Sequence, residues 1–310
     1  MQTLTYQPVA DQQTWREALI LRNAMNFDNP MSFDESQEHV AHHPKESRWI
    51  RELLRDEREA LVYISIFDPW WLKGDAGMQV SICPRSRHAE EYRLGLDRIY
   101  QIARECKTNK LTTWVQTVYP DIQDLLLSHG FKEVQRNVQS ALDLTALSLG
   151  SPNADCEVVS YAGWRDRSPD TWLDDVYRLE MDIGPDIPMT GEYKEMSFEQ
   201  FKSEVFSSVV DLDLCFLAVL DGELAALSQI ILTPAAPELG RTGLTGTRRA
   251  YRRRGLARAL KIVSLNAAKE KGITRVVTDN EVDNPMWDLN VELGFRRDYD
   301  HVAYTLSEVP

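Results

Sequence analysis

The sequence predicts an α/β protein made of two similar domains in tandem. Its 310 residues exceed the usual size of one domain, and hydrophobic residues make up 43% of the chain, enough for two ordinary cores. One order of elements recurs in both halves: an apolar strand, a long amphipathic helix, a strand, a short helix ending in Gly-Phe, and an alternating strand. The Gly-Phe pairs begin at Gly130 and Gly294, about half a chain apart.

In the first half, helical spacing places Leu96, Ile99 and Ala103 on one face of a long helix. The elements expected around it are strands at 60–67, 78–83, 111–118 and 138–144, and helices at 12–26, 46–59, 90–106 and 121–129. The strand at 60–67 is favoured by its alternating pattern.

In the second half, Leu256, Leu260 and Val263 share one helix face, and Asp221-Gly222 is typical of a tight hairpin turn. The elements expected here are strands at 215–220, 223–232, 243–247, 275–278 and 302–306, and helices at 169–181, 197–207, 255–271 and 285–293. The stretch 145–154, rich in Gly, Pro, Ser and Asn, indicates a connection. We therefore expect domains at 1–147 and 156–310, joined by a linker at 148–155.

Composition excludes several classes of protein. No apolar run approaches the length of a membrane span, and the start of the chain lacks the pattern of a secretory signal. The four cysteines are scattered without CxxC spacing, which excludes a disulfide scaffold and the usual zinc sites and fits a reducing compartment. The net charge of −13 disfavours nucleic acid as a partner. We expect a cytoplasmic protein with no metal and no membrane partner.

The charges are unevenly distributed along the chain. Residues 166–199 carry a net charge of −7, whereas residues 248–261 carry seven bases and no acid. A basic cluster of this density in an acidic protein indicates an anionic ligand, although a solvated basic helix face would show the same pattern.

The basic cluster falls between an expected strand and an expected helix. Arg252, Arg253 and Arg254 precede Gly255, which allows close approach of the backbone to a ligand. Unpaired amides and the positive end of the helix dipole at such a junction bind pyrophosphate. The RxxGxA pattern alone is weak, and it is neither a Walker A loop nor the dinucleotide pattern GxGxxG.

In sequence, the stretch 245–261 resembles the acetyl-CoA signature of the GCN5-related N-acetyltransferases (GNAT). Thr278-Asp279-Asn280, Asn284-Pro285-Met286 and the closing Leu289–Phe295 follow in the order and spacing of that family. The resemblance implies two tandem GNAT-like domains, each with a mixed, mostly antiparallel sheet flanked by helices. The layout is similar to the mycothiol-synthase type of tandem acetyltransferase.

The resemblance also implies roles for individual residues. Thr245, Gly246 and Thr247 would lie along the pantetheine arm of acetyl-CoA. Asn280 and Asn284 would contact the pantetheine or order the nearby strand end, and Asn284 would also cap a helix that starts with proline. The pyrophosphate would be held by Arg252, Arg253, Arg254, Gly255, Leu256, Ala257 and Arg258.

The first half departs from the family pattern. Where its phosphate-binding turn between strand and helix (the cradle) should lie, no glycine is present. Glu90 and Glu91 place negative charge at the expected phosphate position. We therefore expect the first domain to be a degenerate GNAT-like domain without acetyl-CoA.

The second half lacks the tyrosine that many relatives carry four residues before the last glycine. Asn290 occupies that position, and an amide does not donate a proton to a leaving thiolate. An amine acceptor is protonated at neutral pH, so its attack on the thioester needs a proton acceptor. The candidate bases are Asp182, Asp186, Asp279 and Glu281, of which the last two flank Asn280.

The sequence thus predicts an acetyl-CoA-dependent N-acetyltransferase. It would act on a small, cationic amine by direct attack in a ternary complex, because the acidic stretch 166–199 would attract such an acceptor. The alternative is a non-catalytic acyl-CoA-binding or regulatory tandem protein, favoured by the missing tyrosine and the degenerate first half. A polyanion binder acting through 248–261 is disfavoured by the net charge.

Overall fold

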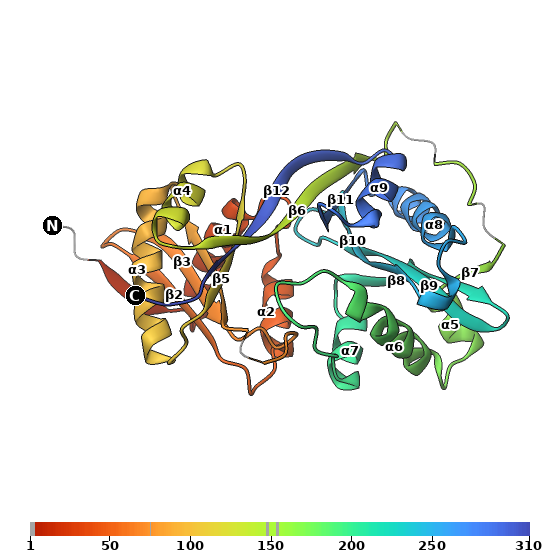
Figure 1. The fold of residues 1–310 in the computed structure, drawn as a ribbon, viewed down its shortest axis with the longest axis horizontal. Helices are drawn as coiled ribbons and strands as arrows, with labels where there is room; N and C mark the ends of the chain where they lie inside the picture. Colours follow the sequence, from red (N-terminus) through yellow and green to blue (C-terminus); the bar gives the residue numbers. More distant parts are fainter. Residues whose placement is uncertain (1–3, 75, 147–148, 153–154) are drawn as a thin grey trace. The chain divides into compact units, whose positions relative to one another are not determined.

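The computed structural model describes residues 4–74, 76–146, 149–152 and 155–310. The chain divides into two compact units (Figure 1). Unit 1 comprises residues 1–138, 189–194 and 299–310, and unit 2 comprises residues 139–188 and 195–298.

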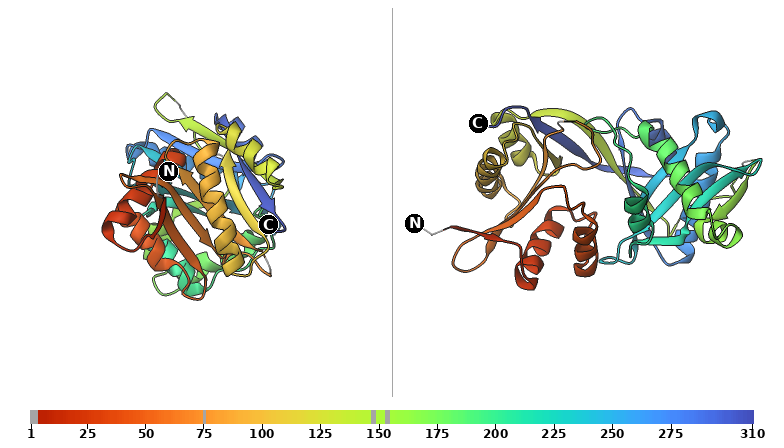
Figure 2. Two further views of the ribbon diagram at one scale, coloured as in Figure 1. Left: turned by 90° about the vertical axis from the view of Figure 1, so that its left-hand side faces the viewer. Right: turned by 90° about the horizontal axis from the view of Figure 1, so that it is seen from below.

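Unit 1 is a sheet in the order β1-β2-β3-β4-β5-β12, with helices on both faces. Figure 2 (right) shows α1 and α2 in red on one face and α3 and α4 on the other. Its elements are β1 (Thr5–Pro8), α1 (Gln12–Met25), α2 (Phe33–His42), β2 (Trp49–Arg55), β3 (Ala60–Phe67), β4 (Met78–Pro84), α3 (Ala89–Glu105), β5 (Leu111–Gln116), α4 (Pro120–Ser128) and, from Tyr299 on, β12 (Arg296–Leu306). All described pairings are antiparallel except that of β4 with β5.

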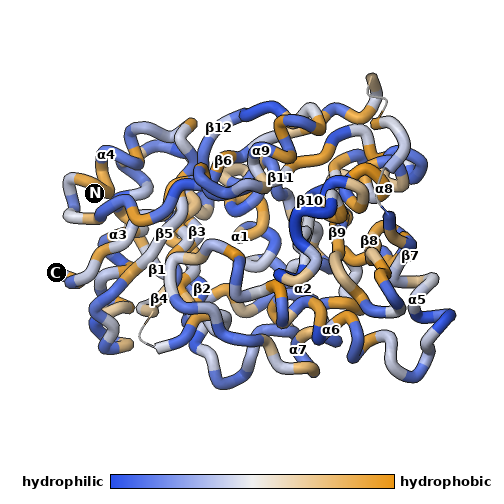
Figure 3. Tube along the Cα trace, turned by 45° about the vertical axis from the view of Figure 1, so that its right-hand side comes forward, coloured by the Kyte–Doolittle hydropathy of each residue, from blue (hydrophilic) through white to orange (hydrophobic). Residues whose placement is uncertain are grey.

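Unit 2 is a sheet in the order β6-β11-β10-β9-β8-β7. Its elements are β6 (Lys132–Asp143) from Gln139 on, β7 (Glu157–Ser160), α5 (Tyr161–Arg167), α6 (Trp172–Ile183), η1 (Gly184–Asp186), α7 (Phe198–Val205), β8 (Val210–Leu220), β9 (Glu223–Leu232), β10 (Leu239–Thr247), η2 (Arg249–Tyr251), α8 (Leu256–Glu270), β11 (Arg275–Glu281) and α9 (Pro285–Glu292). On β9, Leu227 packs with α6 whereas Ala226 packs with α8, because successive side chains point to opposite faces of a strand. The buried strands β8 and β9 are coloured hydrophobic in Figure 3.

The last strand of each half of the chain extends into the other unit. Residues 139–143 of β6 lie beside β11 in unit 2, and β12 pairs with β5 in unit 1, from His301 opposite Gln116 to Leu306 opposite Leu111. Residues 189–194 also belong to unit 1, where Tyr193 bridges to Leu72. The units therefore do not follow the expected boundaries at 147 and 156, and part of the expected linker at 148–155 lies outside the described residues.

The local predictions agree with the structure in most elements. Asp221 and Gly222 both have positive φ (51° and 83°), as a tight hairpin turn requires. The helix expected at 46–59 is wrong: residues 49–55 form β2, which pairs with β1 and β3. Its Glu, Leu and Arg content favours a helix, but burial between two strands overrides that local propensity. None of the helices in the described part of the chain is long and apolar enough to span a bilayer.

Candidate functional site

Two parallel strands of unit 2 separate beside α8. Strands β10 and β11 pair over three residues, ending with Arg241 opposite Val277, and the next residues, Thr242 and Thr278, are joined by a hydrogen bond between their hydroxyls. The pairing of β10 with β9 is also irregular, between Thr242 and Thr245. Beyond this point β10 and β11 no longer share backbone hydrogen bonds.

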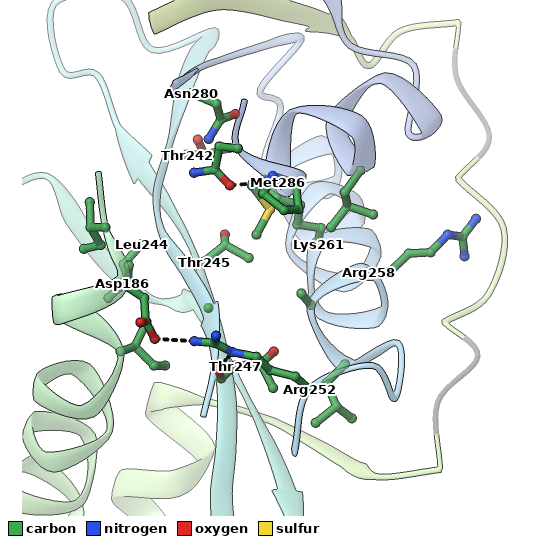
Figure 4. A pocket seen from close by; sticks show the side chains of 18 of the residues that line it. Asp186, Thr242, Leu244, Thr245, Thr247, Arg252, Arg258, Lys261, Asn280 and Met286 are labelled. Atoms are coloured by element: carbon green, nitrogen blue, oxygen red, sulfur yellow. Dashed lines mark hydrogen bonds and ion pairs between the residues drawn. The ribbon is translucent and has the colours of Figure 1, made fainter. Parts of the chain in front are cut away.

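A cavity of about 930 Å³ opens where the strands part (Figure 4). One wall is β10 from Thr242 to Thr247, the opposite wall is Thr278 to Asn280 with the start of α9, and η1 and the first turns of α8 close the ends. A cavity of this size is at the upper end of the range for small-molecule sites.

The start of α8 presents unpaired backbone amides to this cavity. Gly255 has φ 76° and precedes the helix, while Arg253 has φ 65°. The first backbone bond within the helix is donated by the Ala259 amide to Gly255, so the amides before Ala259 have no partner inside the helix. No side chain among the described residues caps this turn, and it contains no acid. Such a terminus attracts phosphate groups.

The corresponding turn in unit 1 is closed by carboxylates. Glu91 accepts a hydrogen bond of 2.8 Å from the Ser86 amide, and Asp121 accepts one of 2.9 Å from the Ala89 amide at the start of α3. Two amides of this turn are thus already bonded to negative side chains. Unit 1 and unit 2 share the strand–turn–helix layout, but only the α8 turn is chemically suited to an anion.

Acidic side chains from α6 and η1 pair with the arginines near the cradle. Asp186 bonds both Arg249, at 2.6 Å, and Arg252, as Figure 4 shows for Arg252. These bonds, led by that to Arg249, hold the pKa of Asp186 below its usual value. Asp182 pairs with Arg248 at 2.8 Å. Two of the acids in the stretch 166–199 therefore neutralise bases of the stretch 248–261. The latter stretch follows β10 and is coloured hydrophilic in Figure 3.

Most of the residues expected to hold acetyl-CoA line this one cavity. They are Thr245, Gly246, Thr247, Arg252, Arg253, Gly255, Leu256, Ala257, Arg258, Asn280 and Asn284. Arg254 does not line it, and the Arg258 side chain extends away from the other labelled groups in Figure 4. Of the expected bases, Asp186 and Asp279 line the cavity, whereas Glu281 and Asp182 do not.

Two asparagines connect the cavity wall to α9. Asn290, at the position of the missing tyrosine, is fully buried and donates a hydrogen bond of 2.6 Å to Asn280. Asn284 caps α9 through the Met286 amide, as expected for Asn-Pro at a helix start. Asn290 thus holds the wall and does not face the cavity.

Lys261 is a buried cation that the sequence analysis counted only as part of the basic cluster. It lines the cavity from α8 (Figure 4), it is 2% exposed, and its ammonium lies 5.7 Å from the ring centroid of Phe295. Burial lowers the pKa of Lys261 to about 8. A lysine on a predominantly apolar helix face was the available signal, but the helical pattern does not show that this face lines a cavity.

Glu180 is a carboxyl group that the sequence analysis did not single out. It lies on α6, one turn before Ile183 of the cavity wall, and accepts hydrogen bonds from Gln229, at 2.7 Å, and from the buried Tyr161 hydroxyl, at 3.2 Å. Burial, together with the negative charge of Glu204, raises the pKa of Glu180 to about 7. Among ten acids in the stretch 166–199, no sequence feature distinguishes this one.

Gln229 carries the network from Glu180 to the cavity wall. Its side-chain oxygen accepts a hydrogen bond of 2.9 Å from the Leu244 amide, within the irregular part of β10. Gly243 is required beside it, because a Cβ there would lie 2.7 Å from the same oxygen. A titratable group is therefore coupled to the backbone of the strand that lines the cavity.

Comparison with known proteins agrees with this layout. The model of the acetyltransferase (GNAT) family matches residues 173–295, which include the cavity residues from Ile183 to Leu289. No curated protein matches this chain in sequence.

Solved structures of similar fold cover the whole chain. A tandem GNAT protein from the clavulanic acid biosynthesis pathway is 18% identical, with a TM-score of 0.76 over 99% of both chains. A GCN5-related N-acetyltransferase from Sphaerobacter thermophilus is 17% identical, with a TM-score of 0.67 over 97% of this chain and 95% of that one. The GNAT family model thus matches most of the second half of the chain, and the chain as a whole has the tandem fold of these solved proteins.

Proposed function

We propose that this protein is an acetyl-CoA-dependent N-acetyltransferase with one donor site, in unit 2, and a small cationic amine as acceptor. The observation that carries the proposal is the cavity between β10 and β11, which ends on the uncapped start of α8. The cavity offers a path for an extended pantetheine arm, and the α8 amides offer hydrogen bonds to its pyrophosphate.

Residue types along the cavity match the successive parts of a coenzyme A thioester. Arg252, Arg253 and Gly255 lie at the phosphate end, with Arg258 on the first turn of α8. Thr245 to Thr247 offer polar backbone along the arm, and α8 supplies apolar contact through Leu256. The proposed acceptor side faces α6, where Glu180 lies.

We assign proton acceptance to Glu180 in preference to Asp279, Glu281 or Asp182. Glu180 has a pKa near 7, so it is largely ionised just above neutral pH and is still a competent base. Asp182 is engaged by Arg248. The proton of the acceptor amine would reach Glu180 through a water molecule beside Gln229, and the neutral amine would then attack the thioester carbonyl.

We assign Lys261 as the cation that meets the leaving thiolate. A free thiol has a pKa of about 8.5, close to the value of about 8 for Lys261, so proton transfer between them is nearly balanced. This group would supply the proton that the missing tyrosine gives in relatives.

A non-catalytic acyl-CoA-binding protein is the second candidate, favoured by Asn290 at the tyrosine position and by the carboxylate-closed turn of unit 1. Release of coenzyme A from acetyl-CoA separates the two candidates. Spermidine and an aminoglycoside should stimulate release, whereas glutamate and glycylglutamate should not. If calorimetry shows donor binding but none of a broad amine panel stimulates release, the protein is the binding module.

A further inference from the structure

Unit 1 contains a cavity of its own, of about 160 Å³, between its sheet and the helices α1 and α2. It lies on the opposite face of the sheet from α3, and all of its lining residues belong to unit 1. No part of the proposed donor site contributes to it.

The floor of this cavity is a polar row across three strands. Arg51 of β2 pairs with Ser65 of β3, and Ser65 pairs with Ser81 of β4, so the three side chains stand side by side on one face of the sheet. A sheet face covered by helices ordinarily carries apolar residues. Ser65 is buried, and Arg51 and Ser81 are half-buried. Placing a cation and two hydroxyls there costs free energy unless they have partners.

Arg51 has aromatic neighbours, and no counter-ion among the residues that the structure describes. Its guanidinium carbon lies 4.6 Å from the Trp15 ring centroid and 5.1 Å from that of Trp49. Within the described residues this guanidinium makes neither an ion pair nor a hydrogen bond. Burial lowers the pKa of Arg51, as expected for a desolvated cation. Its donors are therefore available to a bound acceptor.

The other walls hold the aromatic rings in place, and Arg22 adds a positive charge, whereas burial lowers the pKa of His39 and favours its neutral ring. The Trp15 indole donates to Ser36 and the Trp49 indole donates to Ser65, each at 2.8 Å. Arg22 and His39 also line the cavity, and none of its lining residues is acidic. A cation between fixed indole faces, with no acid nearby, is a receptor for a flat anion.

We propose that this cavity binds a small organic anion in which a carboxylate is attached to a ring-sized or similarly compact apolar group. The carboxylate would pair with the Arg51 guanidinium, whose planar fork matches it with two hydrogen bonds. The apolar part would lie against the indoles of Trp15 and Trp49. The volume suits a molecule of this size, because a cavity of about 150 Å³ accommodates benzene.

The proposal is independent of the acetyltransferase assignment. The ligand of unit 1 is small and anionic, whereas the acceptor proposed for unit 2 is cationic and its donor is far too large for 160 Å³. Unit 1 would thus retain a binding role although its phosphate turn is closed by Glu91 and Asp121.

Calorimetric titration of the full chain with benzoate, benzamide and inorganic phosphate tests the proposal. We expect benzoate to bind at one site per chain, at least about tenfold more tightly than the isosteric neutral benzamide, because only the carboxylate pairs with the guanidinium. Saturable binding of phosphate that is tighter than that of benzoate would overturn the carboxylate assignment. Absence of saturable benzoate binding at millimolar concentration would overturn the site itself.

Three variants locate the binding. Arg51→Met should weaken benzoate binding at least about tenfold, and Arg58→Met, at an exposed turn, should leave it unchanged. Arg51→Lys, which keeps the charge but loses the planar fork, should show intermediate affinity. If Arg51 has only a structural role, Arg51→Met should lower the melting temperature without weakening the binding of benzoate relative to that of benzamide. This result would contradict the proposal.

Discussion

Gln229 bonds to Glu180 at 2.7 Å through its amide nitrogen, and through its oxygen it accepts a hydrogen bond of 2.9 Å from Leu244 on the strand that lines the donor cavity. One side chain therefore connects a carboxyl of raised pKa to the place where β10 leaves its neighbour. This connection is the basis for assigning Glu180 a role in proton transfer.

Glu180→Gln should remove an ionisation from the pH dependence of kcat/KM. In the wild type, activity should rise with pH through about 7, as Glu180 loses its proton and becomes able to accept one. In the variant this rise, the acidic limb of the pH profile, should be absent, and kcat/KM at pH 8 should be roughly 100-fold lower or more. The measurement is kcat/KM for one amine between pH 5.5 and 8.5.

Glu204→Gln is the matched control for that variant. Glu204 raises the pKa of Glu180 by its negative charge but makes no bond to Gln229 in the described residues. Its removal should move the limb to lower pH without abolishing it. An unchanged limb in Glu180→Gln, or its loss in Glu204→Gln alone, would contradict the assignment.

Lys261→Met should stabilise the protein near neutral pH while impairing turnover. The pKa of Lys261 falls from 10.5 to about 8 on folding, so between these values the unfolded chain binds the proton and the folded one does not. Wild-type stability therefore rises with pH across this window. The gain from Lys261→Met should be on the order of 3 kcal/mol below pH 8 and should shrink toward pH 10.5.

Urea unfolding of Lys261→Met and wild type at pH 7 and pH 10 measures this difference, with Lys269→Met, at an exposed position on the same helix, as control. We expect kcat of Lys261→Met to fall roughly tenfold, because coenzyme A is already a fair leaving group. A less stable variant at pH 7 would show that the ammonium is a structural contact.

Asp186→Asn should strengthen acetyl-CoA binding. Asp186 engages Arg249 and Arg252 beside the cradle, and its neutralisation leaves both guanidinium groups free to attract phosphate. Because these side chains are partly exposed, the effect should be about two- to fivefold in Kd and should diminish at high salt. Asp174→Asn, an exposed acid on α6, is the control for net charge. Weaker binding by Asp186→Asn would mean that the ion pairs order the cradle and do not compete with the ligand.

The local part of this structure is predictable from sequence, and the nonlocal part is not. The turn at Asp221-Gly222, the helix from Leu256 and the cradle at Gly255 follow from turn chemistry, periodicity and glycine placement. The exchange of β6 and β12 between the units cannot be predicted in this way, because the sequence of a strand does not determine which strand it pairs with. The helix predicted at 46–59 is wrong for the same reason, because residues 49–55 form a strand whose partners lie elsewhere in the sequence.

The candidate site divides in the same way. The residues proposed to bind the cofactor are contiguous or close in sequence, so their spacing alone predicts the donor site. Glu180, Gln229 and Tyr161 come from three separate elements and meet only through packing of α5 and α6 on β9. The cavity of unit 1 depends likewise on the register that places Arg51 opposite Ser65.

The most direct test of the donor site is calorimetric binding of acetyl-CoA to the wild type, Ala257→Glu and Lys269→Gln. Ala257 lines the cavity in the first turn of α8, where a glutamate suits the helix dipole and should not destabilise the fold. We predict one site per chain in the wild type and in Lys269→Gln, and no measurable binding in Ala257→Glu. Unchanged binding by Ala257→Glu, or two sites in the wild type, would contradict a single donor site at the start of α8.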